Sequence, residues 1–143
     1  MTDLDPLAEE LNSVAIHLVR RLRRSDDALG ITPARLSALS VLVFGGPQSI
    51  NRLARAEQVT GPTMSRIVAA LVEAGLVARE PDPDDARSAR LAATDQGRAA
   101  MERGRRMRVS RLAAELGCLP DADRRTLEAA VRILRRMERA EDG

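Results

Sequence analysis

Residues 50–77 read INRLARAEQVTGPTMSRIVAALVEAGLV, and the spacing of their small and apolar residues decides the fold. Leu53 and Ala54 stand in the first part, Val59 follows Ala54 by five positions, and Met64 opens the apolar series of the second part. Where two short helices cross, a small residue must sit at the crossing and apolar residues must fill the wedge between them. The segment therefore predicts a helix-turn-helix.

The second helix of this pair has two distinct faces by helical geometry. Its inward stripe is Met64, Ile67, Val68 and Leu71, and its outward residues are Pro62, Arg66, Ala69 and Glu73, flanked by Thr63 and Ser65. Small residues around Arg66 suit insertion into a DNA major groove about 12 Å wide, where Arg binds guanine through two hydrogen bonds. Thr60, Thr63 and Ser65 lie at the helix N-terminus, where hydroxyl and N–H groups bind phosphate. The alternative is that Arg66 is a solvated surface residue and Thr60 only a helix cap.

The whole chain predicts a mainly α-helical protein with a small β-hairpin wing. The expected helices cover residues 5–28, 33–45, 49–58, 63–75 and 95–117, with a last helix opening at residue 120 or 121, and the expected strands cover residues 76–81 and 88–94. Thr32 and Thr94 have the side chains of N-caps, and Gly75 can end its helix in a left-handed conformation. Gln58 lies in the turn where Gly is common, so its backbone must adopt the turn without that help.

Composition and charge indicate one intracellular, non-catalytic domain. The 143 residues include 23 Lys and Arg, 21 Asp and Glu, one His and one Cys. His17 and Cys118 lie far apart, which argues against a Cys/His metal cluster or a catalytic pair, so we expect no enzyme activity, no metal and no cofactor. No run of about 18 apolar residues is present and the N-terminus is acidic, so we expect a cytoplasmic protein with no membrane partner.

The two ends of the chain carry apolar stripes with no neighbour in sequence to cover them. The stripes are Leu4, Leu7, Leu11, Val14, Ala15, Leu18 and Leu22 at the N-terminus, and Leu127, Ala130, Val131, Leu134 and Met137 at the C-terminus. In a short chain such stripes often pack against a second copy. We therefore expect an N-terminal dimerisation helix over 1–30, a DNA-binding lobe over 31–95 and C-terminal dimerisation helices over 96–143.

The chain resembles the MarR-type winged helix-turn-helix transcriptional regulators over essentially its whole length. The residues that match most specifically are Gly75, Leu76, Val77 and Arg79, then Asp85 and Arg87, then Thr94 and Gly97. The resemblance implies a homodimer that binds double-stranded DNA, with Arg87 as the wing arginine that enters the minor groove and Asp85 as its paired aspartate. Ala86 stands where many members carry a second Arg, and Ala93 where Leu is usual.

The wing needs a device that aims its arginine, because fixing a free guanidinium costs about 2 kcal/mol of rotamer entropy. Asp85 can supply it by accepting hydrogen bonds from backbone N–H groups or from Arg79 or Arg90, and Arg90 is itself a candidate DNA contact. The alternative is a solvated turn rich in Asp.

Relatives often bind small phenolic or lipophilic acids between their helical dimer region and the DNA-binding lobe. By that resemblance the candidate ligand residues are His17, Phe44 and Arg105. Arg105 shares an apolar stripe with its helical neighbours, so we expect a partner for its charge, either an anionic ligand or a carboxylate of the other chain. His17 and Phe44 suit packing equally, and Cys118 at the junction of the last two helices offers little for redox sensing.

Two functions from different classes fit these features. The first is a dimeric, sequence-specific DNA-binding regulator, a repressor that binds a pseudo-palindromic operator and is released by a small aromatic or lipophilic ligand. The second is a winged-helix protein-interaction module whose acidic wing repels DNA. The outward face of Pro62, Arg66 and Ala69, with Glu73 as its one acid, favours the first.

Overall fold

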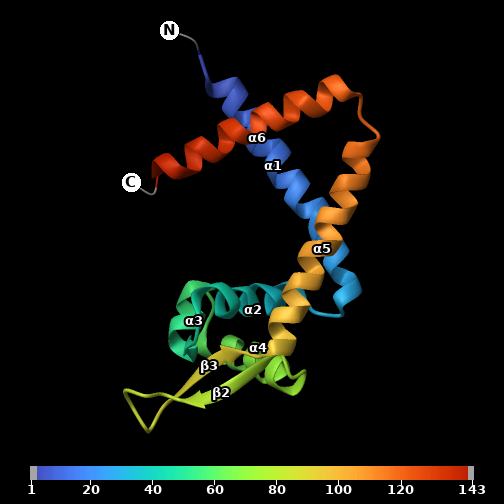
Figure 1. Ribbon diagram of the computed structural model, residues 1–143. Helices are drawn as coiled ribbons and strands as arrows, with labels where there is room; N and C mark the ends of the chain where they lie inside the picture. The colour runs from blue at the N-terminus through green and yellow to red at the C-terminus, as the bar shows by residue number, and fades with distance from the viewer. Residues whose placement is uncertain (1–2, 142–143) are drawn as a thin grey trace. The chain divides into compact units, whose positions relative to one another are not determined.

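The structure, a computed structural model, describes residues 3–141, with the side chains of residues 25 and 141 left aside. The elements are α1 (Asp5–Arg23), the 3-10 helix η1 (Arg24–Leu29), α2 (Pro33–Gly45), β1 (Gln48–Ser49), α3 (Ile50–Ala56), α4 (Gly61–Glu73), β2 (Val77–Pro81), β3 (Ala89–Ala93), α5 (Asp95–Gly117) and α6 (Asp121–Glu141). The chain forms two compact units that divide inside α5, at residues 108 and 109. The mainly helical fold with a β-hairpin is confirmed (Figure 1).

The core of the first unit joins α2, α3 and α4 to the sheet and to the start of α5. Its buried side chains are Ala38, Leu39, Leu42, Leu53, Ala54, Met64, Val68, Leu71, Leu76, Val77, Leu91, Ala93 and Ala100. The predicted inward stripe of the second helix of the pair is confirmed, because Met64, Val68 and Leu71 are buried and Ile67 is half-buried against the same cluster.

The sheet has three antiparallel strands in the order β1-β3-β2, one more than the sequence predicts. In the hairpin, Val77 pairs with Ala93 and Glu80 with Arg90. The additional strand β1 has two residues, and its Gln48 pairs with Leu91 of β3. Two residues cannot show the alternation that identifies a strand, so only the tertiary pairing reveals β1.

The predicted N-caps are confirmed. The Thr32 hydroxyl accepts a hydrogen bond from the backbone N–H of Arg35 at 3.4 Å, and α2 begins at Pro33. The Thr94 hydroxyl accepts one from the backbone N–H of Gly97 at 3.1 Å, in the first turn of α5. Each cap satisfies one of the N–H groups that lack a partner at a helix start.

The predicted left-handed end of α4 is confirmed as well. Gly75 has φ of 73°, and its N–H donates to the carbonyl of Val72 at 3.0 Å. The N–H of Leu76 donates to the carbonyl of Leu71 at 3.0 Å. These two bonds make a Schellman motif, which directs the chain from α4 into β2.

Three predicted helix bounds differ from the structure. The first α-helix ends at Arg23 and continues as η1, a tighter 3-10 helix, which places Asp26 in a buried ion pair with a distant arginine of α5. The third helix is shorter than residues 49–58, because Ser49 is its N-cap and it ends at Ala56. Helix α4 starts at Gly61 and not at residue 63, because Thr60 is the N-cap and the following proline fits the first turn.

Neither α1 nor α6 buries an apolar stripe in the single chain. Helix α1 has no buried residue, and its exposed large apolar side chains are Leu4, Leu7, Leu11, Val14, Ile16 and Val19. Along α6 they are Leu127, Val131, Ile133, Leu134 and Met137. The division into dimerisation helices and lobe that the sequence suggests at residues 30 and 95 stays a prediction.

Candidate nucleic-acid interface

Helices α3 and α4 meet through a four-residue turn that is fixed by hydrogen bonds and one unusual backbone angle. Val59 donates its N–H to the carbonyl of Ala54 at 3.0 Å, and Ala54 is 6% exposed where the two helices cross. Gln58 has φ of 55°, a left-handed conformation that glycine adopts more easily. The backbone thus takes the turn with a residue that strains it.

The outward face of α4 is free of core contacts. The residues predicted to face outward are all exposed, and they are Pro62, Thr63, Ser65, Arg66, Ala69 and Glu73. Around Arg66 the face carries small side chains, and Glu73 at the C-terminal end is its one acid. Such a face can enter a groove and present one guanidinium to base edges.

Thr60 and Thr63 form a linked pair at the N-terminus of α4. The Thr60 hydroxyl accepts from the backbone N–H of Thr63 at 3.4 Å and donates to the Thr63 hydroxyl at 2.9 Å. Thr60 therefore acts as the helix cap and uses its own proton locally, while the Thr63 hydroxyl keeps a proton that it can donate to a phosphate oxygen. Of the two, Thr63 is the better placed for an outside contact.

The acidic loop of the wing uses its carboxylates to shape the hairpin tip. Asp82 accepts from the backbone N–H of Asp84 at 2.9 Å, and Asp85 accepts from the backbone N–H of Arg87 at 3.0 Å. The Asp85 carbonyl accepts from the N–H of Ser88 at 3.1 Å, and the Asp82 N–H donates to the Ser88 carbonyl at 3.2 Å. Side chains of Asp that bond the backbone two residues on form Asx turns, which fix the backbone locally.

Arg87 stands in this turn with an exposed side chain, so its guanidinium is free to reach outward from a defined backbone. Of the two arrangements expected for Asp85, the structure has the bond to a backbone N–H. Arg90 instead forms an ion pair with Glu80, its partner across the hairpin, at 3.7 Å. The Arg90 Nε atom is buried, so this residue is more tied to the sheet than Arg87 is. Arg79 is exposed on β2.

A compact junction joins the end of α4 to the start of α5. The Thr94 hydroxyl donates to the carbonyl of Gly75 at 2.6 Å, and the Thr94 N–H donates to the carbonyl of Leu76 at 3.0 Å. A Cβ on Gly97 would lie 2.2 Å from the Leu76 carbonyl oxygen, so only glycine fits there. The recognition helix, the wing and α5 are therefore held in one rigid arrangement at this point.

The three residues that the sequence nominates for a ligand are not brought together. His17 on α1 is exposed, and Phe44 at the end of α2 is 79% exposed, so the packing role considered for Phe44 is not fulfilled within the single chain. Arg105 is exposed and pairs with Glu102 of its own helix at 2.8 Å. The hydrogen bond from Arg105 lowers the pKa of the Glu102 carboxyl below its ordinary value.

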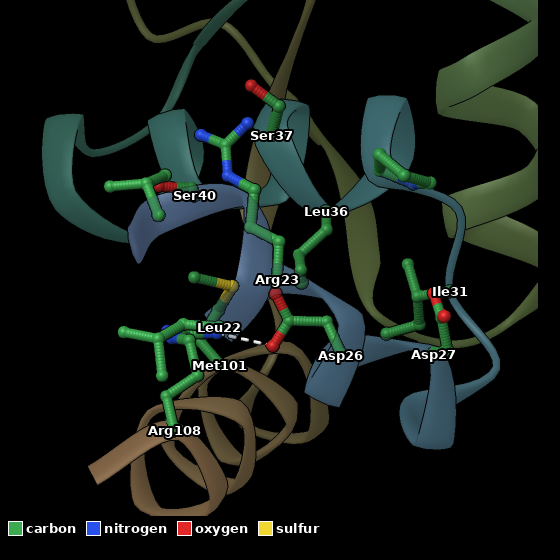
Figure 2. Close-up of a pocket in the computed structure, with 12 residues that line it drawn as sticks. Leu22, Arg23, Asp26, Asp27, Ile31, Leu36, Ser37, Ser40, Met101 and Arg108 are labelled. Carbon is green, nitrogen blue, oxygen red and sulfur yellow. Dashed lines mark hydrogen bonds and ion pairs between the residues drawn. The ribbon is translucent and has the colours of Figure 1, made fainter. Parts of the chain in front are cut away.

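A cavity of about 370 Å³ lies elsewhere, between the end of α1, η1, α2 and α5 (Figure 2). Met101 and Arg108 line it from α5, and Asp26 and Asp27 from η1. Arg108 donates to the Asp26 carboxylate at 2.5 Å, across 82 positions of sequence. The sequence signal that could have pointed here is Gly104, a helix-interior glycine one turn before Arg108, which marks a close approach.

Metal and membrane features are absent from the described part of the chain. Within residues 3–141, no group of three or more His, Cys, Asp or Glu is placed to hold a metal ion. Over the same residues no single helix is long and apolar enough to cross a membrane, although α1 and η1 taken with α2 pass by composition as a pair bent by 93°.

Comparison with known proteins places the fold. Residues 29–88 match the model of the MarR family. An HTH-type transcriptional regulator of Mycobacterium tuberculosis is 32% identical over 135 residues, which cover 94% of each chain. The crystal structure of a transcriptional regulator from Thermotoga maritima superposes with a TM-score of 0.86 at 24% identity, covering 97% of this chain and 99% of that one.

A similar structure is MepR of S. aureus, solved bound to an oligodeoxyribonucleotide, with a TM-score of 0.72 at 19% identity over 90% of this chain and 94% of that one. At such identities the structural matches speak for the winged-helix fold alone. The sequence match to the mycobacterial regulator spans nearly the whole of both chains and agrees with the family model. The chain therefore belongs to the MarR family of transcriptional regulators.

Proposed function

We propose that this regulator is a homodimeric repressor that binds a pseudo-palindromic DNA operator, with α4 in the major groove and the wing in the minor groove. The observation that carries the proposal is the outward face of α4, where Arg66 stands exposed among small residues on a helix whose opposite side is sealed in the core. MepR, a structural neighbour, was itself solved bound to an oligodeoxyribonucleotide.

The base-reading part of the site is Arg66 with the flanking residues of α4. Arg66 lies one turn into the helix from its capped N-terminus, with Pro62, Thr63 and Ala69 on the same exposed side. Arg is the side chain that most often contacts guanine in the major groove, and the small neighbours let the helix approach closely. The hydroxyl groups of Thr63 and Ser65 then supply phosphate contacts that fix the register of the helix.

The wing supports binding through charge and not through base reading. Arg87 is held on a backbone that Asp85 fixes, so less freedom is lost when its guanidinium reaches a groove. The loop also carries Asp82 and Asp84, whose charges repel phosphate, and Ala86 adds no second cation. We therefore expect a wing contact that is weaker than the family pattern alone implies.

Dimer formation follows from the exposed stripes of α1 and α6. On α6 the side chains of Leu127, Val131, Leu134 and Met137 are 42%, 49%, 38% and 57% exposed. Single chains rarely leave such contiguous apolar surface in water, and a closed two-fold pair would cover it. A two-fold dimer would present two copies of α4 to half-sites about one helical turn of DNA apart, which is why we propose a palindromic operator.

A small aromatic or lipophilic effector that releases the DNA is the further part of the proposal. The support is the cavity of about 370 Å³ beside α1, α2 and α5, a size that accommodates a small ligand. His17, Phe44 and Arg105 are outside the set of residues that line it. If an effector binds this chain, the cavity is the site that we expect.

The alternative function, a protein-interaction module that does not bind DNA, draws on one observation. The wing loop carries four carboxylates between residues 80 and 85, and they give the hairpin a local charge that disfavours a phosphate backbone. The two functions differ in a single measurable property, which is enrichment of DNA sequences.

The test is selection of random DNA duplexes by the full chain at physiological salt. A palindromic consensus supports the proposal, and enrichment of nothing favours the protein-interaction module. With the consensus in hand, Arg66→Ala should relax base preference at one position in each half-site, because it removes a base contact. Arg87→Ala should weaken binding to all sequences alike and reduce the salt slope by about one charge.

The matched control is Arg106→Ala, which removes an exposed arginine of α5 and should leave sequence preference unchanged. A salt slope that Arg87→Ala does not move would remove the wing from the proposed mechanism.

A further inference from the structure

The cavity between α1, η1, α2 and α5 combines an apolar wall with a buried ion pair. Its apolar side chains are Val19, Leu22, Ile31, Leu36 and Met101. Asp26 and Arg108 face each other across its edge, and Figure 2 shows their contact as a dashed line. A small organic molecule that enters the cavity must therefore either ignore this pair or replace one of its two members.

The two members of the pair are not equally easy to replace. The Asp26 side chain is 8% exposed, whereas the Arg108 side chain is 27% exposed. Arg108 has a long, flexible stem, so its guanidinium can turn to water when another group takes its place. A carboxylate on a short stem in a buried position cannot do so, and leaving it without a partner is costly.

Gly104 shows that this corner is built around the ion pair. A Cβ at this position would lie 3.1 Å from Leu29 Cδ1, 3.2 Å from Arg108 Nη1 and 3.4 Å from Asp26 Oδ1. The absence of a side chain at Gly104 thus leaves room for the guanidinium beside the carboxylate. A planar cation of similar shape fits the same space.

We propose that the cavity binds a small organic cation with an apolar body, which replaces the Arg108 guanidinium on the Asp26 carboxylate. The apolar body packs on the wall of Leu22, Ile31 and Met101, and a planar N–H fork meets Asp26 as Arg108 does. An anionic ligand would have to take Arg108 away from Asp26 and leave that carboxylate buried and unpaired. The ligand class is therefore opposite in charge to the lipophilic acids that the family resemblance suggests.

Replacement of Arg108 also breaks the link between η1 and α5. Asp26 precedes α2 by a short connection, and Arg108 stands on the helix that continues from the Thr94 junction. As a means of regulating DNA affinity, this step rests on the proposed DNA-binding function. Binding of the cation itself does not, and it can be measured on the protein without DNA.

The experiment compares three probes of similar shape on the full chain: benzamidinium, benzoate and benzyl alcohol. Isothermal titration and thermal shift should show benzamidinium binding at least about tenfold more tightly than benzoate or the alcohol, the effect of a charge-assisted hydrogen bond. Asp26→Asn keeps the shape of the side chain and should remove that preference. Arg108→Ala removes the competing cation and should tighten benzamidinium binding about tenfold.

Arg108→Ala also leaves Asp26 without its partner, so the variant should be less stable and benzamidinium should restore much of its melting temperature. If that variant does not fold, Arg108→Gln decides, because its amide donates one bond and is a weaker competitor than the guanidinium. Arg106→Ala, an exposed arginine on the same helix, is the matched control and should bind benzamidinium as the unaltered chain does.

Preference for benzoate, equal binding of all three probes, or benzamidinium binding that survives Asp26→Asn would each overturn the proposal. Those outcomes leave the DNA selection untouched, so a failure of the ligand class is distinguishable from a failure of the proposed function. Conversely, benzamidinium binding that depends on Asp26 in a chain that enriches no DNA would retain the site and reject the regulatory role.

Discussion

The lobe that carries α4 and the helices α1 and α6 use apolar residues in opposite ways. In the lobe, Leu39, Leu53 and Met64 are 0% exposed, and their burial completes a core within one chain. Along α1 no residue is buried, and on α6 Leu134 and Val131 are 38% and 49% exposed. The lobe is therefore a finished folding unit, whereas α1 and α6 have the periodicity of packed helices and lack the surface that would cover them.

The difference teaches which mutations should act on folding and which on assembly. Substitutions in the lobe should change the free energy of unfolding of a core that is already closed. Substitutions on the stripe of α6 should change association, because that stripe has no core to disrupt. The predictions below test this separation, from the largest expected effect to the smallest.

Gly97→Ala should unfold or severely destabilise the lobe, by more than about 4 kcal/mol, because backbone must move to admit the new atom. The added Cβ would lie 2.2 Å from the Leu76 carbonyl oxygen, which also accepts the Thr94 N–H. Urea denaturation followed by circular dichroism measures the loss. The matched control is Gly117→Ala on the same helix, where a Cβ meets nothing within 4 Å. Equal stability of both variants would contradict the rigid junction.

Leu39→Ala should lower the free energy of unfolding by about 3 kcal/mol and leave the sedimentation coefficient unchanged, because it opens a cavity in the closed core. Leu134→Asp should do the reverse, weakening dimer association at least about 100-fold while the lobe stays folded. Sedimentation velocity over a range of concentrations separates the two effects. Arg132→Asp, on the opposite face of α6, is the charge-matched control. A monomeric unaltered chain at micromolar concentration would reject the dimer.

Arg124→Ala should destabilise the α5–α6 connection by about 1 kcal/mol, because it removes a side-chain cap from the end of α5. The Arg124 Nη1 group donates to the carbonyls of Gly117 at 3.2 Å and Leu119 at 2.7 Å, and its guanidinium also pairs with Asp121. Amide hydrogen exchange at the end of α5 should speed up. Exchange within the lobe should stay as it is, and a uniform increase across the chain would argue against a local cap.

Gln58→Gly should stabilise the lobe by about 0.5 kcal/mol, the smallest effect of the series. Gln58 has φ of 55°, which costs a non-glycine residue about 1 kcal/mol, and the greater freedom of glycine in the unfolded chain offsets part of the gain. The urea midpoint should rise with no change in the slope of the transition. Glu57→Gly, one position earlier at φ of −88°, is the control and should not stabilise.

The candidate DNA site was largely readable from the sequence because its parts are local. The outward face of α4 follows from helical periodicity, and the structure exposes Arg66 and Ala69 as that periodicity predicts. The turn around Asp85 depends on a carboxylate and an N–H two residues apart. The ligand residues could not be predicted in the same way, since the cavity is lined by segments distant in sequence and His17, Phe44 and Arg105 do not line it.

By itself, the sequence determined the order of elements, the caps at Thr32 and Thr94, the left-handed end at Gly75 and the family, because each depends on neighbours within a few positions. Only the tertiary structure decided the two-residue strand β1, the 3-10 turn after α1 and the Asp26–Arg108 ion pair. The physical reason is that these features arise where segments far apart in the chain meet. A pairing across 82 positions leaves no periodic trace in the residues that make it.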